Sequence, residues 1–412
     1  MKKSISAQLS IMMFLEFFIW GGWFVTMGTY LGNTLGASGQ EAGTAYSTQS
    51  WGAIIAPFII GLIADRFFNA ERILAVLHLM GAVLMYMLAT AVDFDHFYPY
   101  LLGYMILYMP TLALVNSVSF NQMDDPAKDF SKIRVWGTIG WIVAGLAISY
   151  AFGWDSEEGV AGGALRNTFM MCSIASLGLG LFSIFLPKTP PSGKGQKAAS
   201  LGELLGLDAL SMLKDRNFLV FFLSSILICI PLAFYYSQAN PFLTEIGMTN
   251  PTGKMTIGQI SEVFFMLLLP VFLTRFGIKK TLLLGMAAWV LRYILFAYGD
   301  TDGKGFMLIL GIAMHGICYD FFFVSGQIYT DAKAGERFKS AAQGLITLAT
   351  YGVGMLIGFE VAGRITDKYA TVLEDVTTHD WTAIWTMPAI FAGVVFVLFL
   401  LTFREEKTKV EL

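Results

Sequence analysis

The sequence predicts an all-α polytopic membrane protein, and three observations support this fold class. Hydrophobic residues make up 56% of the 412 positions and charged residues only 14%, whereas a soluble chain carries about 25% charged residues. The apolar residues gather into stretches of about 20, long enough to cross roughly 30 Å of hydrocarbon as a helix. Lys and Arg are distributed unevenly among the segments that connect these stretches.

Windows of about 20 residues with few charges identify the membrane-spanning helices. We predict twelve spans, at residues 8–31, 43–65, 71–93, 97–122, 131–152, 164–187, 217–239, 254–274, 279–298, 305–330, 338–362 and 381–403. Several neighbouring spans are separated by only a few polar residues, so these pairs are predicted to be antiparallel. The first apolar stretch lacks a clear small-residue cleavage site, which favours a retained span over a secretion signal.

The distribution of Lys and Arg predicts the orientation of these spans. If the N-terminus lies inside the cell, all but six of the 27 Lys and Arg residues fall in inner segments. Inner loops of membrane proteins carry an excess of both residues, so both termini are predicted to be cytoplasmic. No basic stripe indicates a nucleic-acid partner. The six exceptions are Arg166, Lys254, Arg292, Lys304, Arg364 and Lys368.

The longest inner connection, residues 188–216, predicts the domain organisation. It begins KTPPSGKGQKAAS, a composition typical of a flexible linker, and a short amphipathic piece follows at Leu201–Leu213. The linker separates a six-helix bundle at 1–187 from a second one at 217–412. Two pseudo-symmetric six-helix bundles are a recurring transporter plan.

A weak internal repeat supports this division. The segment IADRFFNAERIL at Ile63–Leu74 follows the second span, and the similar segment LTRFGIKKTLL at Leu273–Leu283 follows the eighth.

The polar residues of spans 8 and 10 are the main candidates for function. Gln259 and Glu262 are separated by three positions, and His315 and Tyr319 by four, so each pair shares one helix face. Asp320 lies about a quarter turn further round. A carboxylate at the centre of a membrane helix costs about 2.5–3.5 kcal/mol on insertion scales, so such residues usually mark a pocket or an ion pathway. The alternatives are a helix-to-helix hydrogen bond for the first pair and a packing role for His315.

A second candidate set lies in the segment IRVWGTIGW of span 5. Arg134, Thr138 and Trp141 are spaced at i, i+4 and i+7, so a cation, a hydroxyl and an aromatic plane share one face. This set suits a flat polar ligand. Alternatively, Arg134 extends its charged end to the inner surface while Trp141 contacts lipid.

Several embedded polar residues are weaker candidates. Tyr236 lies near the outer end of span 7, where it either contributes to an aromatic gate or sits at the membrane interface, as Tyr commonly does. Glu16 lies deep in span 1. Arg292 is expected to pair with an acid across the bundle, which would be a structural role. The others are Asn116, Tyr235, Gln238, Asn240, Gln343 and Glu360.

The segment GLIADRFFNAER resembles the loop between spans 2 and 3 of major facilitator transporters. In this interpretation Gly61 allows close helix approach, and Asp65 and Arg66 pair at the inner surface. The alternative is an ordinary charged turn.

No enzyme signature competes with a transport function. The chain has no HExxH, no GxxxxGK[ST] and no GxSxG placed after a strand. Cys172, Cys229 and Cys318 lie in apolar stretches without metal-ligand spacing, so we predict no metal and no cofactor. Because no nucleotide-binding motif is present, energy is expected to come from an ion gradient.

Taken in order along nearly the whole chain, seven segments resemble the nucleoside:proton symporter family, the bacterial nucleoside permeases of the major facilitator superfamily. They are PTLALVNSVSF (Pro110–Phe120), IRVWGTIG (Ile133–Gly140), LLGLDAL (Leu204–Leu210), QISE (Gln259–Glu262), RFGIK (Arg275–Lys279), LRYILFAYGD (Leu291–Asp300) and YDFFFVSG (Tyr319–Gly326).

The resemblance implies the major facilitator fold and proton-coupled nucleoside uptake by alternating access. It implies a multi-pass protein of the bacterial cytoplasmic (inner) membrane, surrounded by lipid and expected to be a monomer. The pocket positions of the family fall on Arg134, Thr138, Trp141, Gln259, Glu262, His315, Tyr319 and Asp320, and we add Tyr236 as a substrate-binding candidate. For proton coupling, Glu262 and Asp320 are alternative carriers, because a poorly hydrated cavity disfavours the charged form of an acid.

The chain departs from the family pattern at three places. Trp141 stands where the family permits another aromatic residue, and His315 stands at a position that can be Tyr. In span 7, Ala233 and Tyr236 replace polar amides. Because of these changes, a transporter of another small polar solute such as a sugar stays open as an alternative. A membrane-embedded enzyme or receptor is the alternative from a different class.

Overall fold

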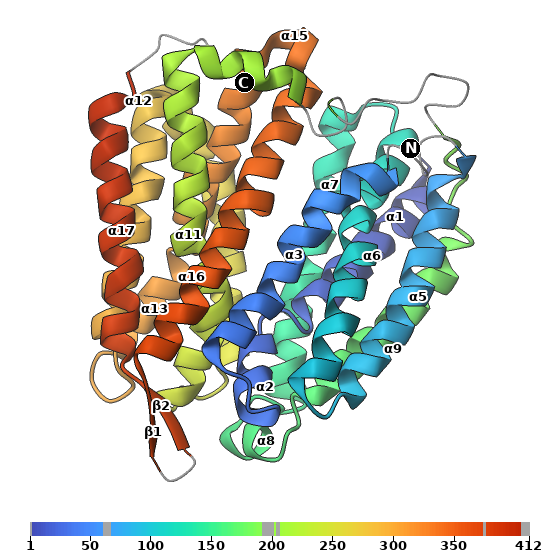
Figure 1. Ribbon diagram of the computed structural model, residues 1–412. Helices are drawn as coiled ribbons and strands as arrows, with labels where there is room; N and C mark the ends of the chain where they lie inside the picture. Colours follow the sequence, from blue (N-terminus) through green and yellow to red (C-terminus); the bar gives the residue numbers. More distant parts are fainter. Residues whose placement is uncertain (1, 61–66, 192–201, 203–206, 374–375, 405–412) are drawn as a thin grey trace. The chain divides into compact units, whose positions relative to one another are not determined.

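The computed structural model describes residues 2–60, 67–191, 202, 207–373 and 376–404, and most of these residues are helical. The chain divides into two compact units (Figure 1). The first unit comprises Met1–Leu201 with Thr249–Gly253, and the second comprises Gly202–Met248 with Lys254–Leu412. Much of the predicted linker at 188–216 lies outside the described residues, so its flexible character stays a prediction.

The first unit is a bundle of long helices. Helix α1 packs against α7 and α9, α3 packs against α6, and α5 packs against both α6 and α9. Its elements are α1 (Lys3–Gly21), α2 (Met27–Thr34), α3 (Gly39–Ile59), α5 (Ala70–Thr90), α6 (Phe94–Asn121), α7 (Pro126–Leu146), the π-helical turn η2 (Ala147–Ala151), α8 (Glu157–Ala161) and α9 (Arg166–Ser183).

The second unit is organised around α11, which packs against α16 and α17. Its helical elements are η3 (Leu207–Lys214), α11 (Arg216–Glu245), α12 (Pro251–Tyr298), α13 (Gly305–Ala313), α14 (His315–Tyr319), η4 (Asp320–Val324), α15 (Ser325–Thr347), η5 (Leu348–Gly354), α16 (Met355–Lys368) and α17 (Trp381–Thr402). A two-stranded antiparallel hairpin, β1 (Ala370–Leu373) and β2 (Val376–His379), joins α16 to α17 (Figure 1).

The local structure differs from the predicted spans where the backbone bends. The first span is predicted as one helix, but a turn at residues 22–26 separates α1 from α2. Gly277 adopts φ 77° inside α12 and Gly335 adopts φ 60° inside α15, a conformation that Gly tolerates without a side-chain clash. The amphipathic piece predicted at Leu201–Leu213 is a 3₁₀ helix at Leu207–Lys214.

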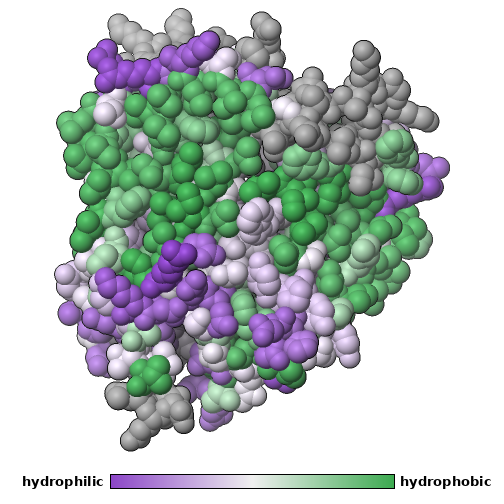
Figure 2. Space-filling model, in the orientation of Figure 1, coloured by the Kyte–Doolittle hydropathy of each residue, from purple (hydrophilic) through white to green (hydrophobic). Residues whose placement is uncertain are grey.

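Among the described residues, nine helices are long and apolar enough to cross a membrane, and the kinked α12 counts as one of them. The number twelve therefore stays a prediction. Large apolar side chains also cover the outside of both units: Phe185 is 73% exposed, and Leu267 and Leu401 are each 75% exposed. Figure 2 shows such side chains over much of the visible surface. Exposed apolar area of this extent marks a membrane or protein contact surface.

Close packing of α1 against α7 depends on Gly140. A Cβ atom added at this position would lie 2.1 Å from the Phe14 carbonyl oxygen, and backbone cannot move aside as a flexible side chain can. Helices α5 and α9 also pack closely at Gly180, where an added Cβ would lie 2.9 Å from Leu79 side-chain atoms. Small residues of this kind allow membrane helices to approach.

We therefore expect Gly140→Ala to destabilise the first unit, because overpacking costs about 1–3 kcal/mol. The thermal unfolding temperature of the detergent-purified protein should fall. Gly178→Ala on α9 is the matched control, because no heavy atom lies within 4 Å of the added Cβ. That variant should be neutral or slightly stabilised, since Ala is favoured over Gly in helices by roughly 0.5–1 kcal/mol. Equal unfolding temperatures for the two variants would contradict the packing argument.

Candidate functional site

Polar and aromatic side chains of the second unit gather around His315. Helix α13 ends at Ala313, and His315 begins α14 directly after a one-residue turn at Met314. A π-helical segment, η4, then begins at Asp320. Segments of this kind rotate the following residues relative to an α-helix and are frequent at functional sites.

His315 connects a buried cation to a carboxylate. The Nη1 atom of Arg292, on α12, lies 3.2 Å from His315 Nδ1. Because a guanidinium can only donate, Nδ1 must accept and the neutral ring carries its proton on Nε2. That nitrogen faces Glu262 Oε2 at 3.9 Å, too far for a direct hydrogen bond. The ring therefore directs its N–H toward the Glu262 carboxylate.

Arg292 is fully buried, and an aromatic face holds its charge. Its Cζ atom lies 3.3 Å from the centroid of the Tyr235 ring, and Tyr235 stacks on His315 with centroids 5.2 Å apart. A desolvated cation–π contact is worth about 2 kcal/mol. The expected pairing of Arg292 with an acid is wrong for the part of the chain that the structure describes: its partners there are the His315 imidazole and aromatic rings, of which Tyr235 is the nearest.

Two further tyrosines complete the aromatic surroundings of His315. The ring centroid of Tyr236 lies 6.4 Å from that of His315, and the ring of Tyr319 lies 5.9 Å away. The Tyr319 hydroxyl is 2.5 Å from the hydroxyl of Tyr351, which belongs to η5. Helices α11, α14 and η5 thus each contribute an aromatic side chain.

Helix α12 is held against α14 by a close backbone approach. The Ser261 hydroxyl accepts a hydrogen bond from the Gly316 N–H at 3.0 Å, and a Cβ added at Gly316 would lie 2.5 Å from Ser261 backbone atoms. This contact brings Glu262, which is 21% exposed, close to His315. Gln259 lies one turn earlier on α12 and is half-buried.

Asp320 is fully buried, and neither of its carboxylate oxygens has a hydrogen-bond partner among the described residues. Such a group costs free energy unless a proton or a ligand supplies the missing partner.

The span 5 candidates lie in the first unit. Arg134 places its Cζ atom 4.1 Å from the centroid of the Phe17 ring, and Trp141 contacts Trp20 edge to face with centroids 5.7 Å apart. Arg134, Thr138 and Trp141 are all half-buried. The structure thus places three predicted site residues in the first unit and six in the second.

The weaker candidates have different surroundings. Asn116 lines an open hollow of about 570 Å³ on α6, together with Ala113, Ser117, Phe120 and Asn121. Gln343 donates to Asp331 Oδ1 at 2.6 Å inside α15. Glu16 is fully buried in a hydrogen-bonded network. The loop residues Gly61, Asp65 and Arg66 lie outside the described residues.

The comparisons with known proteins agree on one family. The sequence model described as nucleoside H+ symporter matches residues 3–408. The chain belongs to this family.

Relatives of this symporter match along nearly their whole length. Two from Escherichia coli (strain K12) are YegT, 46% identical over 98% of this chain and 95% of YegT, and the xanthosine permease, 35% identical over 97% of this chain and 96% of the permease. The crystal structure of a variant of the nucleoside transporter NupG has a TM-score of 0.89 and 31% identity, covering 97% of this chain and 100% of that one. The major facilitator fold is thereby confirmed, and the symporter is a multi-pass protein of the bacterial inner membrane.

The sequence did not predict two residues of the symporter that contact candidate site residues: Tyr351, which contacts Tyr319, and His78, which contacts Glu16. Tyr351 follows span 10 by many residues and shares no helical spacing with Tyr319, so no local pattern connects them. His78 lies in the apolar stretch of span 3, and its single polar side chain was the only signal that could have identified it.

We expect Arg292→Leu to weaken nucleoside binding about tenfold, because hydrogen bonds to charged groups are worth about 1.5–3 kcal/mol and His315 would lose its fixed orientation. Calorimetric titration of the purified symporter measures this affinity. Arg166→Leu, an exposed arginine of the first unit, is the control and should bind normally. A folded Arg292→Leu variant with unchanged affinity would reduce Arg292 to a packing role.

Proposed function

We propose that the symporter takes up nucleosides with protons by alternating access, with residues 1–187 and 217–412 as two moving bundles and 188–216 as their linker. The physiological unit is proposed to be a monomer in a lipid bilayer, with both termini cytoplasmic. Proton-coupled nucleoside uptake is the function of the family to which the chain belongs. The further points rest on the residues described above.

The contact series Arg292–His315–Glu262 carries the proposal for the site. It supplies a fixed cation, an oriented imidazole N–H and a partly exposed carboxylate in one place. A nucleoside offers a flat base and ribose hydroxyls. In this proposal Glu262 and Gln259 accept or donate hydrogen bonds to the ribose or the base edge, and His315 orients the carboxylate that does so.

The aromatic side chains are proposed to bind the base. Base–aromatic stacking is worth about 1–3 kcal/mol per base, and Trp141, Tyr236 and Tyr319 present ring faces for it. Arg134 and Thr138, on the same helix face as Trp141, contribute a cation and a hydroxyl. In span 7, Ala233 is buried and apolar, so selectivity there depends on shape rather than on amide hydrogen bonds.

Glu262 and Asp320 are the proposed proton carriers. The Asp320 carboxylate has no hydrogen-bond partner among the described residues, and it is not exposed to solvent. A proton is therefore the simplest group that could compensate its buried oxygens. Glu262 is more accessible and faces His315 Nε2–H. Protonation removes a negative charge from the pocket and favours closure over the nucleoside, and proton release to the inside restores that charge.

We expect Glu262→Gln and Asp320→Asn to abolish uphill uptake while leaving nucleoside exchange, because each amide keeps the shape of the acid but cannot titrate. Uptake of radiolabelled nucleoside into reconstituted vesicles, with and without an imposed proton gradient, measures the coupling. Glu245→Gln is the matched control, since this acid at the end of α11 binds His379 of the hairpin. If both test variants concentrate nucleoside like the wild type, these acids are not the carriers.

Trp141→Ala is expected to weaken the binding of every nucleoside about tenfold, in keeping with a stacking contribution of about 1–3 kcal/mol. Trp136→Ala is the matched control on the same helix, because the Trp136 side chain is exposed. Calorimetric titration with a panel of purine and pyrimidine nucleosides compares the two variants. Equal affinities for both would remove Trp141 from the binding site.

A further inference from the structure

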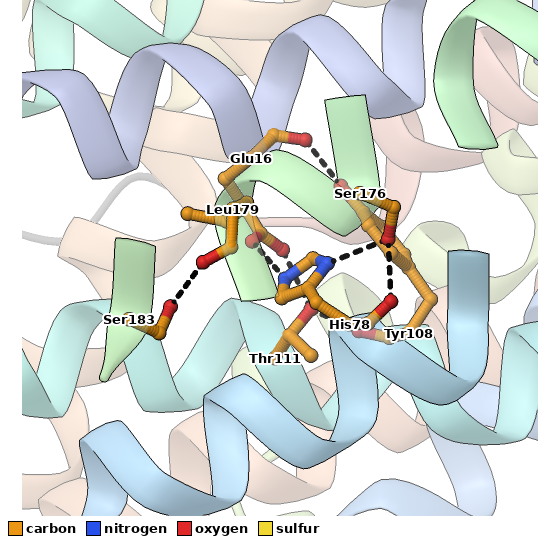
Figure 3. A network of polar contacts seen from close by, with 7 residues as sticks. All are labelled: Glu16, His78, Tyr108, Thr111, Ser176, Leu179 and Ser183. Carbon is orange, nitrogen blue, oxygen red and sulfur yellow. Dashed lines mark hydrogen bonds and ion pairs between the residues drawn. The ribbon is translucent and has the colours of Figure 1, made fainter. Parts of the chain in front are cut away.

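A second polar cluster lies in the first unit, where α1, α5, α6 and α9 meet. Figure 3 shows Glu16 of α1 and His78 of α5 with their side chains directed at each other. Glu16 is 0% exposed and His78 is 2% exposed. Two titratable groups of opposite type are thus enclosed together, and the site proposed above uses neither of them.

The cluster is a continuous series of short contacts. His78 Nε2 lies 2.8 Å from Glu16 Oε2, and His78 Nδ1 lies 3.1 Å from the Ser176 hydroxyl. On the other side, the Thr111 hydroxyl lies 2.6 Å from Glu16 Oε1. The Tyr108 hydroxyl donates to the Glu16 backbone carbonyl at 2.7 Å, which fixes α1 relative to α6.

Two proton arrangements fit the heavy-atom positions of the Glu16–His78 pair, and they differ by one proton. The Ser176 hydroxyl lies 2.9 Å from the His78 backbone carbonyl, an atom that can only accept. If Ser176 gives its one proton to this carbonyl, His78 Nδ1 must carry a proton of its own to bond Ser176. A further proton must then lie between His78 Nε2 and Glu16 Oε2. The pair then holds two protons and is neutral overall.

A state with one proton fewer fits the same positions of the heavy atoms. The remaining proton stays on the His78 Nε2 side, facing the Glu16 carboxylate, and Ser176 turns its hydroxyl proton toward the bare Nδ1. The His78 carbonyl then loses one hydrogen bond. Glu16 keeps its negative charge, and a buried uncompensated charge is costly. The release of this proton therefore requires water to reach the pair.

The surroundings offer Glu16 little other compensation. Helix α6 contributes the hydroxyls of Thr111 and Tyr108, with Tyr104 stacked on Tyr108. Helix α9 contributes the Cys172 thiol, which donates to the Ile19 carbonyl. Helix α7 contributes Arg134, whose charge lies over Phe17, the residue next to Glu16. In the part of the chain that the structure describes, His78 is the ion-pair partner of Glu16.

We propose that Glu16 and His78 form a second proton-binding site of the symporter, which takes up and releases one proton in each transport cycle. This inference rests on the proposed proton-coupled transport, and it adds a site in the first unit to the acids of the second unit. When the first unit admits water, the pair releases its proton to that water. The pair later regains a proton from the outside. The competing explanation is a permanently neutral pair that only holds the four helices together.

The number of protons moved per nucleoside separates these two explanations. Reconstituted vesicles are given opposed gradients of nucleoside and protons, and the gradient ratio at which net flux stops gives the stoichiometry. Glu16→Gln keeps a similar shape but cannot titrate, so it should move about one proton fewer per nucleoside than the wild type while still exchanging nucleoside. An unchanged stoichiometry in an active variant would overturn the second site. Uncoupled transport by the wild type would instead overturn the proposed function.

Two serines on α9 provide a matched pair of controls. Ser176 and Ser183 are both fully buried, but Ser176 contacts His78 whereas Ser183 donates to the Leu179 carbonyl of its own helix at 2.7 Å (Figure 3). Ser176→Ala should shift the pH at which uptake is half-maximal, and Ser183→Ala should not. Equal pH profiles for both variants would contradict the proton arrangement described above.

A measurement on the wild-type protein keeps the test valid if Glu16→Gln does not fold. The chain has 4 histidines, so nitrogen NMR of ring-labelled histidine gives a short list of signals. The His78 signals are assigned by their loss in His78→Gln, or by elimination with variants of the other three histidines. His78 Nδ1 should carry a proton at the low-pH end of the range in which uptake occurs and lack it at the high-pH end. An Nδ1 signal that is constant over this range would overturn the proposal.

Discussion

The geometry of the candidate site in the second unit depends on the buried Arg292. A guanidinium in an apolar bundle has to be compensated, and the described residues around it supply an aromatic face and an imidazole nitrogen rather than a carboxylate. This choice fixes the His315 tautomer and aims its N–H at Glu262. The Glu262 side chain is 21% exposed, so the acid that is proposed to face the substrate is accessible to a ligand.

The buried acid of the first unit, Glu16, differs from the buried acid of the second unit, Asp320, in its hydrogen bonds. Glu16 has a hydrogen-bond partner on each carboxylate oxygen, His78 on one and Thr111 on the other, whereas both oxygens of Asp320 lack one among the described residues. A satisfied pair can hold its proton without any ligand. An unsatisfied carboxylate is sensitive to whatever enters beside it. Under the two proposals above, the first unit provides a storage site and the second a responsive site for the same ion.

Composition and the length of the apolar stretches predicted the membrane fold, and the resemblance of seven segments predicted the family, which is confirmed over almost the whole chain. Spacing also predicted that Gln259 and Glu262 share a face, because that geometry is local. It did not predict the contact of Arg292 with His315 or of Glu16 with His78, since these residues lie on different helices and nothing in one helix specifies its neighbour. The break after α1 was missed because its residues, GWFVT at 22–26, are as apolar as the helix before them.

The backbone around His315 gives a reason why this region can respond to a ligand. Gly316 allows α14 to touch α12 through Ser261, the residue before Glu262. The following π-helical segment begins at Asp320, and π-helical turns are less favourable than continuous α-helix. A helix that is tightly held at one point and loosely wound just beyond it can change its register there at low cost. Glu262, the residue after Ser261 on α12, and Asp320, the first residue of the π-helical segment, thus both lie next to this part of the backbone.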